Sequence, residues 1–219
     1  MAMRFSVCSA VAVLAAALAL AGCERVIDHP QPRAEPPVAP ITVGQIGDLL
    51  SPKVDKTDGN LFVSVEPEDC AGVAREVEPP FIEDFHPAAY DGGHWTDFTA
   101  GREVHIEEMI GVYRADYNAK EALAQANKTI DSCRDRTFWV TSMSGREYAF
   151  QMGPPVESGT PEIVLWSFSG SNWACDSAFV AAFNAAIEIS TCGPVNGYDV
   201  KSLAEQALER IETLANTTA

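Results

Sequence analysis

Six cysteines and their positions constrain the fold of this 219-residue chain most. Cys8 lies within an apolar N-terminal stretch and Cys23 directly follows it, whereas the other four are spread over the rest of the chain, at Cys70, Cys133, Cys175 and Cys192. No pair has C-x-x-C spacing, so the sequence supports neither a thioredoxin-like redox site nor a zinc knuckle. In an oxidising compartment the four later cysteines predict two disulfides, for which the sequence alone permits three pairings.

The N-terminal stretch predicts that the chain is exported. Arg4 precedes an apolar run that ends in small residues at Ala21, which is the layout of a secretory signal and is short for a spanning helix. The end of the run, Leu-Ala-Gly followed by Cys23, resembles a bacterial lipobox. The resemblance implies a lipoprotein signal peptide over residues 1–22 and a Cys23 that carries a diacylglyceryl group and an acyl chain such as palmitate. The alternative is an ordinary secretory signal with a chance cysteine.

Residues 23–40 are predicted to be a tether that begins at the lipidated cysteine. Five prolines and few large apolar residues lie between Glu24 and Pro40, a composition that stays extended because it has no face to bury. At ~3.1 Å per residue, such a segment can hold a domain up to ~50 Å from the membrane. We therefore expect a lipid-anchored protein on the extracytoplasmic face of the cell membrane, with one folded domain over residues 41–219.

The net charge excludes some partners. The chain has a formal net charge of −16 at pH 7. Such a surface is repelled by phosphate backbones and anionic headgroups, so we expect no nucleic-acid partner and no membrane contact beyond the anchor at Cys23.

Apolar periodicity predicts helices at both ends of the domain and in its middle. Residues 118–133 place Ala119, Ala122, Leu123, Ala126, Ile130 and Cys133 on one face, and residues 199–216 form a second amphipathic helix that should lie across a sheet. A weak helix is predicted at residues 41–50. Another begins at Pro67 and ends before Pro79, with Cys70 on its apolar face.

Most of the remaining residues favour strands. Apolar, β-branched and aromatic runs predict them at residues 62–65, 104–113, 137–142, 146–152, 163–168, 173–182 and 185–191. The alternation slips at Glu107-Glu108, which predicts a bulge there. Residues 81–101 have no clean period and contain glycines and a proline, so we predict a long loop.

These elements choose among the three pairings of cysteines. Cys175 and Cys192 lie on consecutive predicted strands, at equal separations from the turn residues Phe183 and Asn184, so they face each other in a two-residue hairpin. Cys70 and Cys133 both lie on buried faces of predicted helices. We therefore expect these two pairs as disulfides, with a structural role.

The ordered elements resemble the PknH-like extracellular sensor domain of mycobacteria, which occurs on a receptor kinase and in stand-alone lipoproteins. The features that match are the early helix with Cys70, the alanine-rich helix that ends in Cys133, the hairpin from Trp173-Ala174-Cys175 to Cys192, and the C-terminal helix. The resemblance covers roughly residues 41–219. It implies an α+β fold with an antiparallel sheet of about five or six strands backed by helices, two disulfides, and a cleft for an unidentified ligand. It brings no catalytic residue.

The sequence also lacks the motifs of several enzyme classes. It has no Gly-rich phosphate loop, no His-Arg-Asp or Asp-Phe-Gly of a kinase, no Gly-x-Ser-x-Gly elbow and no His-Glu-x-x-His. His105 lies on a predicted strand without a second histidine at helical spacing. His86 and His94 share the predicted loop with Asp84, Asp91 and Asp97, where a solvated polar loop is favoured over a cation site. We expect no enzymatic activity, no metal and no cofactor.

The candidate ligand residues are aromatic and basic. Rings provide apolar area with a polar edge, and an arginine in an acidic protein suits an anionic group, so the candidates for cleft walls are Trp95, Trp139, Arg146, Tyr148 and Trp166. The favoured hypothesis is a non-enzymatic envelope lipoprotein whose sensor-like domain binds a small molecule, glycan or lipid in a cleft. The alternative is an interaction module that docks another envelope protein.

Overall fold

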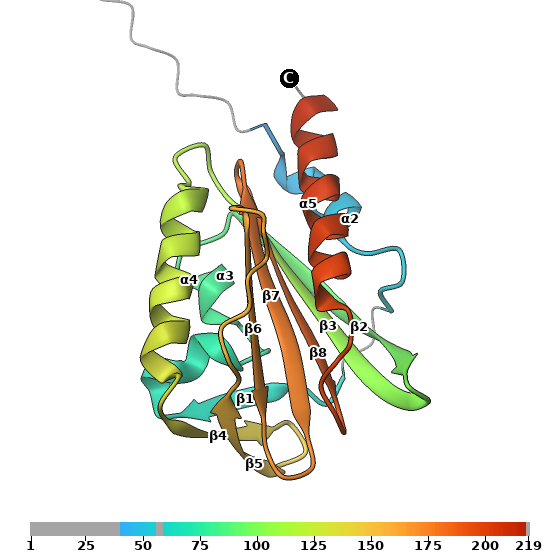
Figure 1. Ribbon diagram of the computed structural model, residues 1–219. Coiled ribbons are helices and arrows are strands. Elements are labelled where there is room, and N and C mark those ends of the chain that lie inside the picture. Colours follow the sequence, from blue (N-terminus) through green and yellow to red (C-terminus); the bar gives the residue numbers. More distant parts are fainter. Residues whose placement is uncertain (1–39, 56–58, 218–219) are drawn as a thin grey trace, which may run out of the picture. The chain divides into compact units, whose positions relative to one another are not determined.

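One antiparallel sheet organises the chain (Figure 1). The computed structural model describes residues 40–55 and 59–217. Its eight strands are joined in the order β1-β4-β5-β6-β7-β8-β3-β2 and curl into a half-barrel. Their bounds are β1 Phe62–Glu66, β2 Ala89–Thr99, β3 Arg102–Val112, β4 Thr137–Ser142, β5 Glu147–Met152, β6 Ile163–Ser169, β7 Ala174–Ala182 and β8 Ala185–Gly193.

Helices cover both faces of the sheet. On one face lie the 3-10 helix η2 (Glu68–Val73) and the helices α3 (Pro80–Glu83) and α4 (Ala119–Cys133); on the other lie η1 (Val43–Gln45), α2 (Ile46–Leu49) and α5 (Val200–Thr217). Each face has its own apolar core. The two long helices were predicted correctly, because each buries one apolar stripe: α4 buries Leu123 and Ile130, and α5 buries Leu208 and Ile211.

The α+β class is confirmed, but the sheet has eight strands and not the five or six expected; one of them, β2, was predicted to be a loop. β2 pairs with β3 along its whole length, from Ala89 opposite Val112 to Thr99 opposite Arg102. All of its residues are described, and Trp95 is its one buried residue. An edge strand with so little buried surface shows no period-2 apolar pattern, so the sequence signal was missing.

Two local expectations are also corrected. β3 runs past Glu107 and Glu108 in continuous register with both neighbours, so no bulge lies there. The alternation slips because both carboxyl side chains are buried, on opposite faces of the sheet. The register shift lies instead in β1, between Phe62 and Ser64. The early helix is shorter than predicted: η2 ends at Val73, and the chain then turns so that Glu76 reaches β1.

The two disulfides have the expected pairing. Cys70–Cys133 joins η2 to the end of α4, and Cys175–Cys192 joins directly opposed residues of β7 and β8. Both connect elements next to the same apolar core.

One ion pair is deeply buried. The Glu108 side chain is 1% exposed, and its carboxylate accepts hydrogen bonds from Arg210 of α5 and from the Ser51 N–H, at 2.6 Å for the latter. Arg210 also donates through Nε to the Leu49 carbonyl, at 2.7 Å. Desolvation raises the pKa of Glu108, whereas the charge of Arg210 opposes that rise. The pair thus ties α5 to α2 and β3.

The predictions for residues 1–22 and 23–39, which include a lipidated Cys23, concern residues outside the described part of the chain. Within the described part of the chain, no helix is both long and apolar enough to cross a membrane.

Removing Cys175–Cys192 by a double substitution to alanine should lower the free energy of unfolding by about 3 kcal/mol. Removing Cys70–Cys133 should lower it by about 4 kcal/mol, because this disulfide closes a longer loop and so restricts the unfolded chain more. Urea denaturation without reductant measures both. Equal stability of either variant and the parent would contradict this assignment.

Arg210→Ala should lower the free energy of unfolding by about 3 kcal/mol at pH 8, because it leaves a buried charge without its cation. The loss should shrink as the pH is lowered, because protonation of Glu108, whose pKa is raised by burial, removes the buried charge. Lys201→Ala, which breaks an exposed pair with Glu205, is the matched control and should cost less than about 0.5 kcal/mol. A cost for Arg210→Ala no larger than this control would contradict the role given to the buried pair.

Candidate functional site

A cavity of about 780 Å³ lies where the curled sheet brings β1, β4 and β5 near β2, β3 and β8. Such a volume suits a small organic ligand. The cavity is lined by the segment before β1, by both strand groups and by the β6–β7 turn, with Gly59, Asn60, Leu61, Phe62, Glu76, His94, Thr96, His105, Ile106, Glu107, Met143, Ser144, Arg146, Tyr148, Trp173 and Cys192.

Aromatic rings form a continuous wall of this cavity. The centroids of Phe62 and Tyr148 are 5.6 Å apart, and Tyr148 and Trp173 are 6.2 Å apart. His105 stacks on Trp173 at 5.8 Å with an interplanar angle of 27°. We call these four residues the aromatic wall. It offers ring faces that can stack on a flat or apolar part of a ligand, or attract a cation.

Glu76 lies at the inner side of the cavity and connects two strands that are far apart in the sheet. Its Oε2 accepts a hydrogen bond from the Phe62 N–H of β1, and its Oε1 accepts one from the Ser190 hydroxyl of β8, both at 2.8 Å. The N–H groups of Glu76 and Val77 also donate to the Phe62 carbonyl. We call this arrangement the Glu76 bridge.

Three carboxyl groups surround Ser190 in this region. Glu76 is bound to its hydroxyl, Glu107 is the residue opposite it on β3, and Glu188 precedes it by two residues on the same face of β8. Burial raises the pKa of Glu76 to about 7, although its two hydrogen bonds oppose the rise. Burial, followed by the nearby charge of Glu76, raises the pKa of Glu188 well above its ordinary value. The cavity therefore has an acidic inner end that can exchange a proton near neutral pH.

Arg146 lies beside Tyr148 of the aromatic wall. It follows the β4–β5 turn at Gly145, and its guanidinium approaches the Tyr148 hydroxyl at 3.5 Å. Among the described residues it forms no ion pair with a carboxylate, and it is exposed. A free guanidinium is uncommon beside a cavity in so acidic a protein, so it is available to a ligand.

The structure brings together two of the five predicted ligand residues. Arg146 and Tyr148 line the cavity. Trp139 is 54% exposed on β4 and points away from the apolar core, whereas Trp95 and Trp166 are buried in the cores on opposite faces of the sheet. The indole N–H of Trp166 donates to the Val73 carbonyl at 2.8 Å, which is the role of a satisfied core residue.

Sequence reasoning did not select Glu76, His105 or Trp173 as ligand residues. Trp173 was noted only for its place in the hairpin, and His105 only as half of a metal motif. Glu76 follows a short 3-10 helix and carries no local pattern; its contacts to residues 62 and 190 depend on the folded sheet.

Of the polar residues of the predicted loop, Asp91, His94 and Asp97 lie on β2, whereas Asp84 and His86 lie between α3 and β2. The backbone of His94 pairs with Asp55, and its side chain lines the cavity. Asp97 lines a second cavity, which is described next. Over residues 40–55 and 59–217, no three His, Cys, Asp or Glu side chains are arranged to hold a metal ion.

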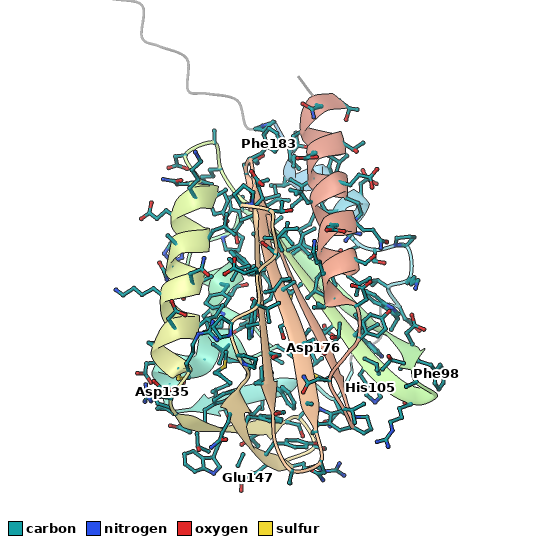
Figure 2. All side chains as sticks on the ribbon, in the orientation of Figure 1. Phe98, His105, Asp135, Glu147, Asp176 and Phe183 are labelled. Carbon is teal, nitrogen blue, oxygen red and sulfur yellow. A yellow bond between two sulfur atoms is a disulfide. The ribbon has the colours of Figure 1, made fainter. Side chains whose placement is uncertain are left out.

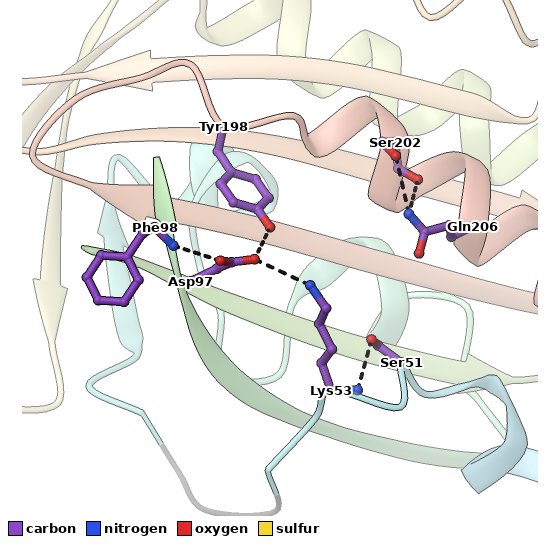
Figure 3. A network of polar contacts seen from close by, with 7 residues as sticks. All are labelled: Ser51, Lys53, Asp97, Phe98, Tyr198, Ser202 and Gln206. Carbon is purple, nitrogen blue, oxygen red and sulfur yellow. Dashed lines mark hydrogen bonds and ion pairs between the residues drawn. The ribbon is translucent and has the colours of Figure 1, made fainter. Parts of the chain in front are cut away.

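A second cavity, of about 460 Å³, lies between the β2–β3 hairpin and the start of α5. Figure 3 shows its polar network: Asp97 accepts from the Phe98 N–H and the Tyr198 hydroxyl, each at 2.8 Å, and from Lys53 at 3.3 Å. These hydrogen bonds lower the pKa of Asp97, that with the Phe98 N–H the most. Because its carboxylate already binds three donors, this network fastens the hairpin to α5 and is a weaker candidate for a ligand site.

The main cavity and the entry of the chain lie at different ends of the domain. Figure 2 shows Phe183, at the tip of the β7–β8 hairpin, at one end, and His105 and Glu147 towards the other. Next to Phe183, the Asn184 side chain accepts from the Ile41 N–H at 3.0 Å and donates to the Ile41 and Tyr113 carbonyls. The segment that begins the described domain is thus fixed at the end away from His105.

The fold and cavity define an α+β extracellular domain of the sensor type, which is crosslinked by two disulfides. The chain belongs to the PknH-like extracellular domain family, whose model matches residues 32–210. This is a non-catalytic domain type, and with the disulfides it indicates an extracytoplasmic location.

A solved structure shares the fold. The crystal structure of the extracellular domain of PknH from Mycobacterium tuberculosis is similar to this chain with a TM-score of 0.59 and 15% identity, covering 84% of this chain and 98% of that one. Among curated proteins, none matches this sequence.

Glu76→Gln should stabilise the protein in a pH-dependent manner. The raised pKa means that the wild type loses stability as the pH rises from about 4.5 through about 7, since the charged carboxylate is disfavoured in the fold. Glutamine carries no charge; its one oxygen can accept from the Phe62 N–H, and its NH₂ group can donate to the Ser190 hydroxyl, which then acts as the acceptor. The variant should therefore equal the wild type near pH 4.5 and exceed it by up to about 3 kcal/mol at pH 8. Urea denaturation at several pH values measures this difference.

The control is Glu147→Gln, which changes an exposed carboxylate on β5 that does not line the cavity. A stability difference for Glu76→Gln that stays constant from pH 5 to pH 8 would contradict the burial of the Glu76 charge.

Proposed function

We propose that the protein is a cell-envelope lipoprotein whose extracellular sensor-like domain binds a small molecule, glycan or lipid in the main cavity and performs no catalysis. The observation that carries the proposal is the cavity itself. It has the volume of a ligand site, an aromatic wall along one side, and polar groups at its two ends. This combination of apolar lining and a few placed polar groups is typical of small-molecule sites.

The place of the cavity within the domain is compatible with this proposal. Ile41, near the start of the described residues, is held beside the tip of the β7–β8 hairpin. His105, which lines the cavity, lies away from that tip (Figure 2).

A second candidate function is docking of another envelope protein. One observation favours it: large apolar side chains are exposed on and beside the paired strands β1 and β4. Trp139 of β4 is 54% exposed, Val63 of β1 is 38% exposed, and Met143, just beyond the end of β4, is 54% exposed. Aromatic side chains, tryptophan above all, are enriched in protein interfaces.

The two functions make opposite predictions for two tryptophans. In a thermal-shift and calorimetric screen of cell-wall fragments, Trp173→Ala should weaken the binding of any hit at least tenfold, because it removes part of the aromatic wall. Trp139→Ala should leave that binding unchanged. Melting curves of both variants report whether they remain folded.

The docking function predicts the reverse. Cross-linking in intact cells would then capture a stoichiometric partner, and Trp139→Ala would abolish that capture whereas Trp173→Ala would not. If no compound binds, or if the binding of every hit survives Trp173→Ala, the proposed cavity function is overturned.

A further inference from the structure

We propose, on the basis of the ligand-binding function above, that the cavity accepts a zwitterionic ligand of the class of short peptides: a free amine binds at the Glu76 end and a carboxylate binds at Arg146. Glu76 and Arg146 both line the cavity, and Phe62 and Tyr148 of the aromatic wall lie between them.

A series of contacts along the cavity connects these two charges. Ser190 binds Glu76, and Glu76 binds the Phe62 N–H. The Phe62 ring contacts Tyr148, and the Tyr148 hydroxyl approaches Arg146. Phe62 and Tyr148 thus lie between the carboxyl group and the guanidinium, and no ion pair in the described chain joins these two groups.

Two carboxyl groups lie close together at the Glu76 end. Glu76 lines the cavity, and Glu188 lies close enough to Glu76 for their charges to interact. Glu188 is 9% exposed, and its Oε2 accepts no hydrogen bond from the described residues. The charge of Arg75 also acts on Glu188, and the Arg75 guanidinium donates to the Glu78 carbonyl and the Glu68 carboxylate.

An amine fits this end for two reasons. An ammonium group carries three donors and one positive charge, which match carboxylate acceptors, and the adjacent ring faces attract a cation. His94 and His105 also line the cavity; His105 approaches Glu103 at 3.5 Å, so its protonated form already has a partner outside the carboxyl cluster.

A carboxylate fits the Arg146 end. The guanidinium is planar and binds carboxylates through two parallel hydrogen bonds. The protein as a whole carries a charge of −16, so a free anion is repelled from most of its surface. A ligand that also brings an amine offsets that repulsion at the acidic end. A neutral glycan would leave the charges at both ends of the cavity unpaired.

The test uses the purified full chain and alanine peptides of two to four residues as probes, each in three forms: unblocked, N-acetylated and C-amidated. Calorimetry should detect binding of at least one unblocked peptide. Acetylation of its amine and amidation of its carboxylate should each weaken binding at least tenfold. The disaccharide N,N′-diacetylchitobiose, which is uncharged, serves as the comparison ligand.

Two variants assign each charge to its end. Arg146→Gln should remove the difference between the carboxylate and the amide forms, and leave the effect of acetylation intact. Glu76→Gln should remove the difference between the amine and the acetylated forms, and leave the effect of amidation intact. Arg102→Gln and Glu147→Gln, which change exposed charges outside the cavity lining, should alter neither difference.

The outcomes separate this inference from the proposed function. Binding of the chitobiose in the cavity, lost in Trp173→Ala and unaffected by Arg146→Gln and Glu76→Gln, would overturn the zwitterion inference and keep the proposed function. Peptide binding that ignores blocking of both ends would also overturn the inference. If neither the peptides nor any compound of the cell-wall screen binds, both are overturned.

Discussion

The Glu76 bridge is the interaction on which the rest of this structure depends. A single carboxyl group accepts one hydrogen bond from β1 and one from β8, strands separated by four others in the order of the sheet. Because the sheet curls, these strands approach each other, and the carboxyl group spans the gap. The bridge holds the two sides of the cavity at a fixed separation and so keeps the cavity open. The aromatic wall lies on one side, and β3 and β8 lie on the other.

Burying this carboxyl group is unfavourable, and the disulfides explain how the fold tolerates it. Cys175–Cys192 fastens β8 two residues from Ser190, and Cys70–Cys133 anchors η2, the element that leads into Glu76. Both staples restrict the unfolded chain and so favour the folded state. The stability they supply offsets the cost of placing Glu76 and Glu188 in a desolvated site. Carboxyl groups whose pKa is raised by burial are characteristic of functional sites.

The sequence predicted the features that arise from local patterns. α4 and α5 followed from their apolar stripes, and the pairing of Cys175 with Cys192 followed from a two-residue hairpin. β2 could not be predicted, because an edge strand with one buried residue has no apolar alternation. Only part of the candidate site could be predicted from the sequence. Tyr148 and Arg146 were selected by residue type, but the place of Glu76 depends on contacts with residues 14 and 114 positions away in the chain.

A carbon-13 NMR titration of the Glu76 side-chain carboxyl group tests the central claim most directly, since it reports the protonation of that one group in the folded protein. We expect a midpoint at a pKa of about 7, because the carboxyl group lies desolvated between β1 and β8. A midpoint at the ordinary value of 4.5 would show that Glu76 is solvated, and would contradict both the bridge and the cavity that it holds open.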